Sequence, residues 1–238
     1  MGNLVLIRHG ESICNANNIF TGWLDSPLTD KGKNEAVIAG KILEESGYKF
    51  DIGFTSVLCR AQETLNIILK ELKNENIHIE KSLFLNERHY GSLEGMNKDE
   101  ARNIFGSEMV QQWRRGLTER PPKISLDEYD KLVNDPKYKG VSTEYLPFSE
   151  NLDDVNKRTI KYFKESIEPH LKKGKNVIIA AHQNSIRSLI YYLEKLPDDE
   201  MLKIETGNCV PISYILDQDL NILNKHIYNS EVNDIKTK

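Results

Sequence analysis

Cysteine is scarce in this sequence of 238 residues, which contains only Cys14, Cys59 and Cys209. Three widely spaced cysteines form neither a disulfide framework nor the paired pattern of a zinc site. Such usage suits a reducing compartment, so we predict a cytoplasmic protein.

Long apolar runs are also missing, because no stretch approaches the roughly 20 residues that a helix needs to cross a bilayer. The first residues lack the charge and core pattern of a signal peptide. Lysine and arginine number 32 against 36 acidic residues, which gives a formal net charge of −4. We therefore predict no membrane partner and no nucleic-acid partner, and an anionic ligand would need a local cluster of cations.

Familiar nucleotide motifs do not occur either, since the sequence has no Walker loop and no dinucleotide-binding glycine fingerprint. What remains is the composition of an ordinary globular protein, 39% hydrophobic and 29% charged. We predict a single domain over residues 1–238, with an irregular insertion at about 116–150 and a polar tail at 229–238.

Short apolar runs that end in polar residues predict buried strands of a parallel sheet. The first run, residues 4–7, leads into Arg8, His9 and Gly10. Further strands are predicted at 50–55, 77–85, 176–181, 210–216 and 220–228.

Helical periodicity alternates with these strands, and a polar, asparagine-rich loop at 13–28 is long enough to suggest a function. The alternation predicts an α/β fold in which a mostly parallel central sheet lies between two layers of helices, a three-layer α/β/α arrangement. The helices are predicted at 30–45, 56–72, 98–105, 107–115 and 151–171, and from residue 183 onward.

Two of the predicted strands end in histidine, at His9 and His182. Right-handed crossovers make these strands neighbours, and ligands of such sheets bind beyond the carboxyl ends of the strands. Arg60 stands in the first turn of a predicted helix, where a cation opposes the helix dipole unless an anion is bound there. The same edge of the sheet also receives Arg8, Glu87, Arg114 and Arg115.

These residue types together suit phosphoryl transfer through a phosphohistidine, without a metal. A neutral imidazole is a nucleophile, guanidinium groups bind phosphate, and a carboxylate can move the proton of the leaving oxygen. Two alternatives remain. His9 could be a hydrogen-bonded packing residue, or it could join His89, His182 and Glu87 as a metal ligand, although neighbouring arginines would repel a cation.

The segment Arg8-His9-Gly10-Glu11-Ser12 resembles the signature of the histidine phosphatase superfamily, and further motifs resemble those of its cofactor-dependent phosphoglycerate mutases. The resemblance extends from the first strand to about residue 216. The further motifs are Asn15, Phe20-Thr21-Gly22-Trp23, Thr55-Ser56 with Arg60-Ala61, Leu85-Asn86-Glu87-Arg88-His89-Tyr90-Gly91, Asn97-Lys98, Trp113-Arg114-Arg115 with Pro121-Pro122, and Ala180-Ala181-His182 with Asn184-Ser185-Ile186-Arg187.

The resemblance implies a phosphoglycerate mutase-like fold, a homodimer or homotetramer, and interconversion of 3-phosphoglycerate and 2-phosphoglycerate in glycolysis and gluconeogenesis, primed by 2,3-bisphosphoglycerate. It implies that His9 is phosphorylated, that His182 stabilises the phosphoryl group, and that Glu87 donates and accepts the proton. Arg8 and Arg60 would act with them as catalytic residues. The binding residues would be Arg8, Ser12, Asn15, Thr21, Gly22, Arg60, Glu87, Tyr90, Lys98, Arg114, Arg115, Gln183 and Asn184.

Three residues depart from the pattern of that family, namely Cys14 for a usual Trp, Asn17 for a usual Glu and Gln183 for a usual Gly. At Gln183 we expect an ordinary backbone torsion, a main-chain contact to the ligand and a side chain turned away from it. Other activities of the same superfamily remain open, a phosphatase or a bisphosphoglycerate synthase, as does an inactive phosphate-binding module.

Because guanidinium groups would supply the positive charge around the phosphoryl group, the reaction should need no metal ion. We expect activity to survive EDTA and to be inhibited by vanadate, which mimics the five-coordinate phosphoryl group. Loss of activity in EDTA that manganese or zinc restores would contradict this prediction.

Overall fold

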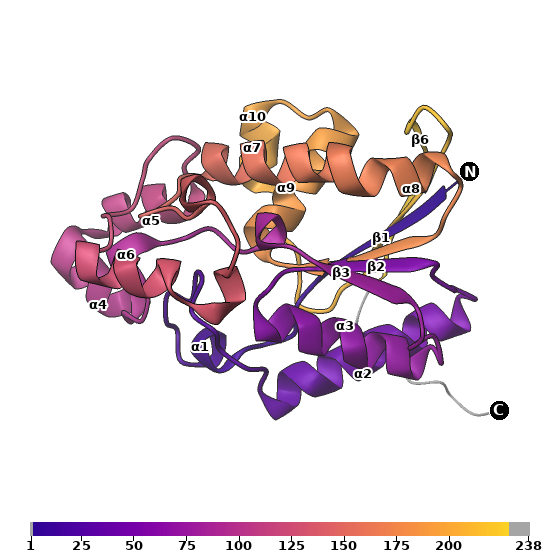
Figure 1. The fold of residues 1–238 in the computed structure, drawn as a ribbon, viewed down its shortest axis with the longest axis horizontal. Helices are drawn as coiled ribbons and strands as arrows, with labels where there is room; N and C mark the ends of the chain where they lie inside the picture. Colours follow the sequence, from indigo (N-terminus) through magenta and orange to yellow (C-terminus); the bar gives the residue numbers. More distant parts are fainter. Residues whose placement is uncertain (1, 229–238) are drawn as a thin grey trace.

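Strand β1 (Gly2–Arg8) lies inside the central sheet of the computed structural model, which describes residues 2–228 (Figure 1). Residues 4–7 of this strand are fully buried, as a strand covered on both faces must be. The other strands are β2 (Ile52–Thr55), β3 (His78–Lys81), β4 (Val177–Ala181), β5 (Ile212–Leu216) and β6 (Ile222–Ile227).

The six strands form one sheet in the order β3-β2-β4-β1-β5-β6. β1 runs parallel to β4, with Leu4 opposite Val177 and Arg8 opposite Ala181, and antiparallel to β5. β2 is parallel to both β3 and β4, and β6 is antiparallel to β5. The mostly parallel sheet is confirmed, and its register brings the ends of β1 and β4 together.

Helices cover both faces of the sheet, as predicted (Figure 1). Because side chains alternate along a strand, Val5 and Ile7 pack with α2 (Asp30–Glu45) and α3 (Cys59–Glu71) on one face. Leu4 and Leu6 belong to the core on the opposite face, which the chain from 152 to 194 covers. Its helices are α7 (Leu152–Tyr162), α8 (Glu168–Lys172) and α9 (Gln183–Glu194).

Shorter helices gather beyond the carboxyl ends of the parallel strands, at the left of Figure 1. This position places them around the edge at which the histidines were expected. They are α1 (Ile13–Ala16), α4 (Lys98–Phe105), α5 (Ser107–Arg115) and α6 (Leu126–Val133), and α10 (Asp198–Lys203) follows α9.

Several predicted boundaries were wrong. The strand expected at 77–85 ends at Lys81 and a 3-10 turn covers 83–85, while the helix expected from 56 begins at Cys59. The helix expected at 151–171 contains a π-helical turn at 163–167. The segment 116–150 is not wholly irregular, because Ser125 and Glu128 form a capping box that begins α6.

Two short helices, α1 and α10, were not predicted, whereas α2, α4 and α5 have the expected bounds. Within residues 2–228 no helix is both long and apolar enough to cross a membrane. The predicted polar tail at 229–238 lies outside the described residues.

Gly32 is the third residue of α2 and lies against the loop that follows His9. A Cβ atom there would be 2.1 Å from the main-chain oxygen of Glu11. Alanine normally stabilises a helix over glycine by about 1 kcal/mol, but here overpacking should reverse the sign. We expect Gly32→Ala to lower the free energy of unfolding by about 1–3 kcal/mol in urea titrations.

The matched control is Asn34→Ala, an exposed position two residues further along the same helix. It should cause no loss of stability. If Gly32→Ala proved as stable as the unmodified protein, the close packing of this loop on α2 would be refuted.

Candidate active site

His9 directly follows the buried strand β1, and its side chain is only 3% exposed. Its Nδ1 lies 2.6 Å from the main-chain oxygen of Gly10, and a carbonyl only accepts, so Nδ1 holds the proton. Nε2 therefore has the free lone pair, and the Nε–H of Arg60 donates to it at 3.3 Å. Burial, assisted by Arg60 and Arg8, holds the pKa of His9 well below 6.5. The result is a neutral imidazole with one reactive nitrogen.

His182 follows β4, and its ring centroid lies 5.0 Å from that of His9. Its Nε2 is 2.7 Å from the hydroxyl of Ser56, while its Nδ1 is buried without a partner among the described residues. Burial and then Arg60 lower the pKa of His182 well below 6.5. The parallel pairing of β1 with β4 thus places two uncharged imidazoles side by side, as the sequence predicted.

Arg60 is 1% exposed, and among residues 2–228 only neutral groups contact its guanidinium. Nη2 donates to the oxygen of Gly22 at 2.7 Å, Nη1 to that of Leu24 at 2.8 Å, and Nε to His9. Burial lowers the pKa of Arg60, because the charge has lost its water. A buried cation without a carboxylate in contact is costly, and an anion bound beside His9 would offset that cost.

The loop that provides these carbonyl oxygens is anchored by Phe20 and Trp23, which are 1% and 4% exposed. Gly22 has φ +51°, and a Cβ there would be 1.8 Å from a carboxylate oxygen of Glu94. That oxygen accepts from the main-chain N–H groups of Trp23 and Tyr90 at 3.0 and 2.8 Å. Burial raises the pKa of Glu94 to about 8. Sequence reasoning missed Glu94, which joins this loop to the segment of Glu87.

Glu87 is 8% exposed, and one of its carboxylate oxygens has two donors. Asn184 Nδ2 donates to it at 2.6 Å and the main-chain N–H of Arg88 at 2.7 Å. Asn184 itself accepts from Arg88 and Arg187, at 3.2 and 2.9 Å. Glu87 is thereby fixed to the first turn of α9, directly after His182.

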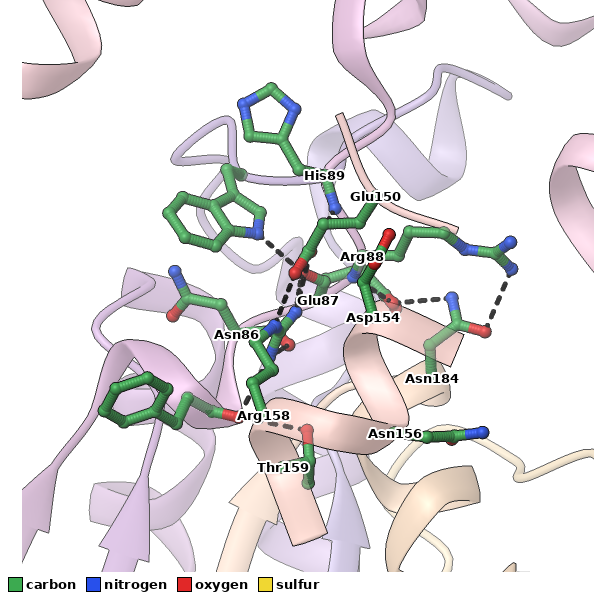
Figure 2. Close-up of polar contacts among 12 residues, drawn as sticks. Asn86, Glu87, Arg88, His89, Glu150, Asp154, Asn156, Arg158, Thr159 and Asn184 are labelled. Atoms are coloured by element: carbon green, nitrogen blue, oxygen red, sulfur yellow. Dashed lines mark hydrogen bonds and ion pairs between the residues drawn. The ribbon is translucent and has the colours of Figure 1, made fainter. Parts of the chain in front are cut away.

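The main chain around Glu87 is held from α7, as Figure 2 shows. Arg158 donates to the oxygens of residues 84, 86 and 87 at 2.9–3.0 Å, and it pairs with both carboxylate oxygens of Glu150 at 2.6 and 2.9 Å. Trp23 Nε1 donates to the oxygen of Glu87 at 2.6 Å. Sequence reasoning missed Arg158 and Glu150, which lie more than 60 residues from Glu87.

Gln183 is the first residue of α9 and has an ordinary negative φ, as predicted. The side chain makes contacts within the protein, and its expected orientation away from a ligand stays a prediction. Its Oε1 accepts from Arg8 Nη1 at 3.1 Å and from the hydroxyl of Thr206 at 2.8 Å, and its Nε2 donates to the oxygen of Ile204 at 3.3 Å. Gln183 therefore joins Arg8 to the segment 204–206.

His9, Arg60 and Glu87 meet at a cleft of about 190 Å³. His182 does not line this cleft and lies fully buried beside His9. Most of the predicted catalytic and binding residues line the cleft: Arg8, His9, Asn15, Thr21, Gly22, Arg60, Glu87, Tyr90, Lys98, Arg114, Arg115, Gln183 and Asn184. Sequence reasoning assigned no role there to Ile19, Phe20, Arg187, Glu205 and Thr206, of which Arg187 was signalled by its place one turn after Asn184.

Ser12, a further predicted binding residue, does not line the cleft. It is fully buried and caps α1 by accepting from the N–H of Asn15. The cations of the cleft are crowded, since burial and then Arg114 and Arg8 lower the pKa of Lys98 to about 8. An anionic ligand would relieve this repulsion.

No group of three or more His, Cys, Asp and Glu side chains is placed to hold a metal ion within residues 2–228. His89, a member of the alternative ligand set, does not line the cleft and is stacked at 5.4 Å from Trp23. Its Nδ1 accepts from the N–H of Gly91, and burial lowers its pKa to about 4. The cleft thus combines a neutral imidazole, a carboxylate and several cations, which are groups suited to phosphoryl transfer.

Comparison with known proteins agrees with this chemistry. The sequence model of the histidine phosphatase superfamily (branch 1) matches residues 4–223, and the chain belongs to that superfamily. It is 47% identical over 238 residues to a protein of Borreliella afzelii (strain PKo) named 2,3-bisphosphoglycerate-dependent phosphoglycerate mutase, covering 99% of this chain and 95% of the relative. A protein of Borreliella burgdorferi (strain ZS7) with the same name is 46% identical over the same shares.

Among solved structures, a phosphoglycerate mutase from Bacillus anthracis str. Sterne has the same fold, with a TM-score of 0.65. It is 23% identical to this chain, and the match covers 95% of this chain and 91% of that one. This likeness concerns the fold alone.

The contacts of His9 predict how it responds to pH. Because burial and two arginines lower its pKa, His9 should stay neutral, with the proton on Nδ1, as the pH falls through 6.5. Long-range ¹⁵N–¹H NMR spectra, assigned with His9→Ala, would measure this, and the urea-unfolded protein provides the control, since free histidine titrates near 6.5. Protonation of Nε2 at pH 6 would contradict the proposed state of the nucleophile.

Proposed function

We propose that this protein is a 2,3-bisphosphoglycerate-dependent phosphoglycerate mutase, which interconverts 3-phosphoglycerate and 2-phosphoglycerate in glycolysis and gluconeogenesis. The main observation is the neutral Nε2 of His9 among buried cations, with Glu87 in the same cleft. The names of the relatives at 46–47% identity support the same activity.

The cleft fits a multiply charged phosphoglycerate. Within the described part of the chain, six cationic side chains line it, against two carboxylates. Three buried polar atoms of its surroundings have no partner among the described residues, namely Arg8 Nε, Thr21 Oγ1 and His182 Nδ1. Buried polar groups normally have partners, so these atoms are suited to bind a ligand.

When bound, 2,3-bisphosphoglycerate supplies the phosphoryl group that primes the enzyme. His9 Nε2 attacks phosphorus, so an N–P bond forms as the P–O bond breaks. Glu87 gives a proton to the departing oxygen. In the reverse step Glu87 takes the proton from a substrate hydroxyl, which attacks the phosphoryl group and releases His9. Arg8, Arg60 and His182 would stabilise the charge of the transferring group without rearranging.

Residues at the other end of the cleft would hold the remainder of the ligand. Lys98, Arg114 and Arg115 would bind the carboxylate and the second phosphate, and Tyr90 would help to orient the ligand. The mutase cycle needs such retention, because phosphorylated His9 gives its phosphoryl group to the bound monophosphate and must then take the other phosphoryl group from the resulting bisphosphate. Release of the bisphosphate between the two transfers would leave His9 unphosphorylated and end the cycle. We further propose that the enzyme is a metal-independent, cytoplasmic homodimer or homotetramer formed by a single domain.

The decisive test supplies purified protein with 3-phosphoglycerate, with and without 2,3-bisphosphoglycerate. We expect 2-phosphoglycerate to form, at a rate that the bisphosphate raises. His9→Ala should fold, lose activity and take up no acid-labile label from labelled 2,3-bisphosphoglycerate. The control His78→Ala, at an exposed position of β3, should label normally.

Other outcomes would replace the proposal. Release of inorganic phosphate in place of isomerisation would indicate a phosphatase, and net formation of the bisphosphate a synthase. Binding without turnover would indicate an inactive module. Labelling of His9→Ala at the normal level would refute the role of His9.

A further inference from the structure

The cleft contains one acid that the proposed chemistry does not use. Among the residues that line it, Glu87 and Glu205 are the two carboxylates. Glu87 would move the proton, whereas Glu205 is a negative charge in a site for anions. Like charges repel, so Glu205 weakens binding unless it is neutralised.

Glu205 is neutralised by Arg115, at the carboxyl end of α5. Its Oε1 lies 2.6 Å from Arg115 Nη2, and the two side chains are 71% and 32% exposed. This ion pair joins two segments that are far apart in the chain, and both of its residues line the cleft. The carboxylate of Glu205 is therefore bound to Arg115, a cation that the ligand would need.

The main chain on both sides of Glu205 is fixed, so its side chain alone is free to move away. The oxygen of Ile204 accepts from Arg187 at 2.8 and 3.1 Å. Arg8 donates to the oxygen of Thr206 at 3.0 Å, and the Thr206 hydroxyl donates to Gln183. An exposed carboxylate on a fixed segment can therefore leave Arg115 without disturbing the rest of the cleft.

We propose that Glu205 is an affinity-setting residue, which occupies Arg115 in the free enzyme and is displaced by the anionic end of the phosphoglycerate. This inference rests on the proposed function. The ligand must replace one carboxylate on Arg115 by another and also withstand the repulsion of the freed Glu205. The opposing effect acts alike on the bound substrate and on the transition state, so it raises KM and leaves kcat unchanged.

The test compares Glu205→Gln with Glu200→Gln, an exposed change of equal charge on α10, next to Lys203. Exposed ion pairs are weak, so we expect Glu205→Gln to lower the KM for 3-phosphoglycerate about two- to fivefold at low salt, with kcat unchanged. The difference should shrink at high salt, because ions screen the pair. Glu205→Asp keeps the negative charge, so its KM should be close to that of the unmodified enzyme.

A second measurement separates this role from a general change in charge or stability. Vanadate, which would bind at His9 and not reach Arg115, should inhibit Glu205→Gln and the unmodified enzyme equally. Calorimetry with 3-phosphoglycerate and unprimed protein should show the same two- to fivefold tighter binding, independently of turnover. Glu200→Gln should change neither the inhibition by vanadate nor the Kd for 3-phosphoglycerate.

The outcomes distinguish the two proposals. An unchanged KM and Kd in Glu205→Gln would refute the competition, and a raised KM would show instead that Glu205 orients Arg115 for binding. If the unmodified protein bound 3-phosphoglycerate without turnover, the proposed function would fail while the calorimetric comparison still tested Glu205. If it did not bind at all, both proposals would be overturned.

Discussion

The hydrogen bond from the buried guanidinium of Arg60 to His9 Nε2 is the interaction on which the site depends. It directs a fixed positive charge at the nitrogen that must stay unprotonated, while Gly10 holds the proton on Nδ1. The same cation lies where negative charge would develop during phosphoryl transfer. This contact thus adds to the effect of burial in keeping His9 neutral, and it would prepare the site for an anionic ligand. The surrounding loops chiefly have to hold Arg60 in place.

The strand ends and the chemistry of this site follow from the sequence, because they depend on local patterns. A buried run before His9 and another before His182 predict two adjacent strands, and their register confirms this. Arg158 had no such signal, since a cation on an amphipathic helix is usually on its solvated face. Its function in holding the segment of Glu87 arises from contacts more than 70 residues apart in the chain.

Gln183 shows at a single residue that local sequence patterns do not predict contacts with distant segments. Its ordinary torsion was predictable, because an L-residue other than glycine avoids positive φ. The direction of its side chain was not, since its partners include Thr206 and Ile204, in a segment whose path no local pattern indicates. The short helix α6 is a different case, because its capping box was visible in the sequence and outweighs the irregular composition around it.

Most arginines of the cleft are held in a way that keeps their charge available. Arg60 is bound by carbonyl oxygens and His9, Arg8 by an amide and a carbonyl oxygen, and Arg187 by a carbonyl oxygen and Asn184. Neutral acceptors fix a guanidinium without cancelling its charge, so the ligand meets oriented cations. Arg115 differs, because its partner is the carboxylate of Glu205. Solvent reaches this ion pair, so displacing the carboxylate from Arg115 costs little free energy. The interior of the cleft is thus suited to stabilise the transferring group, and its rim to limit how tightly the ligand is held.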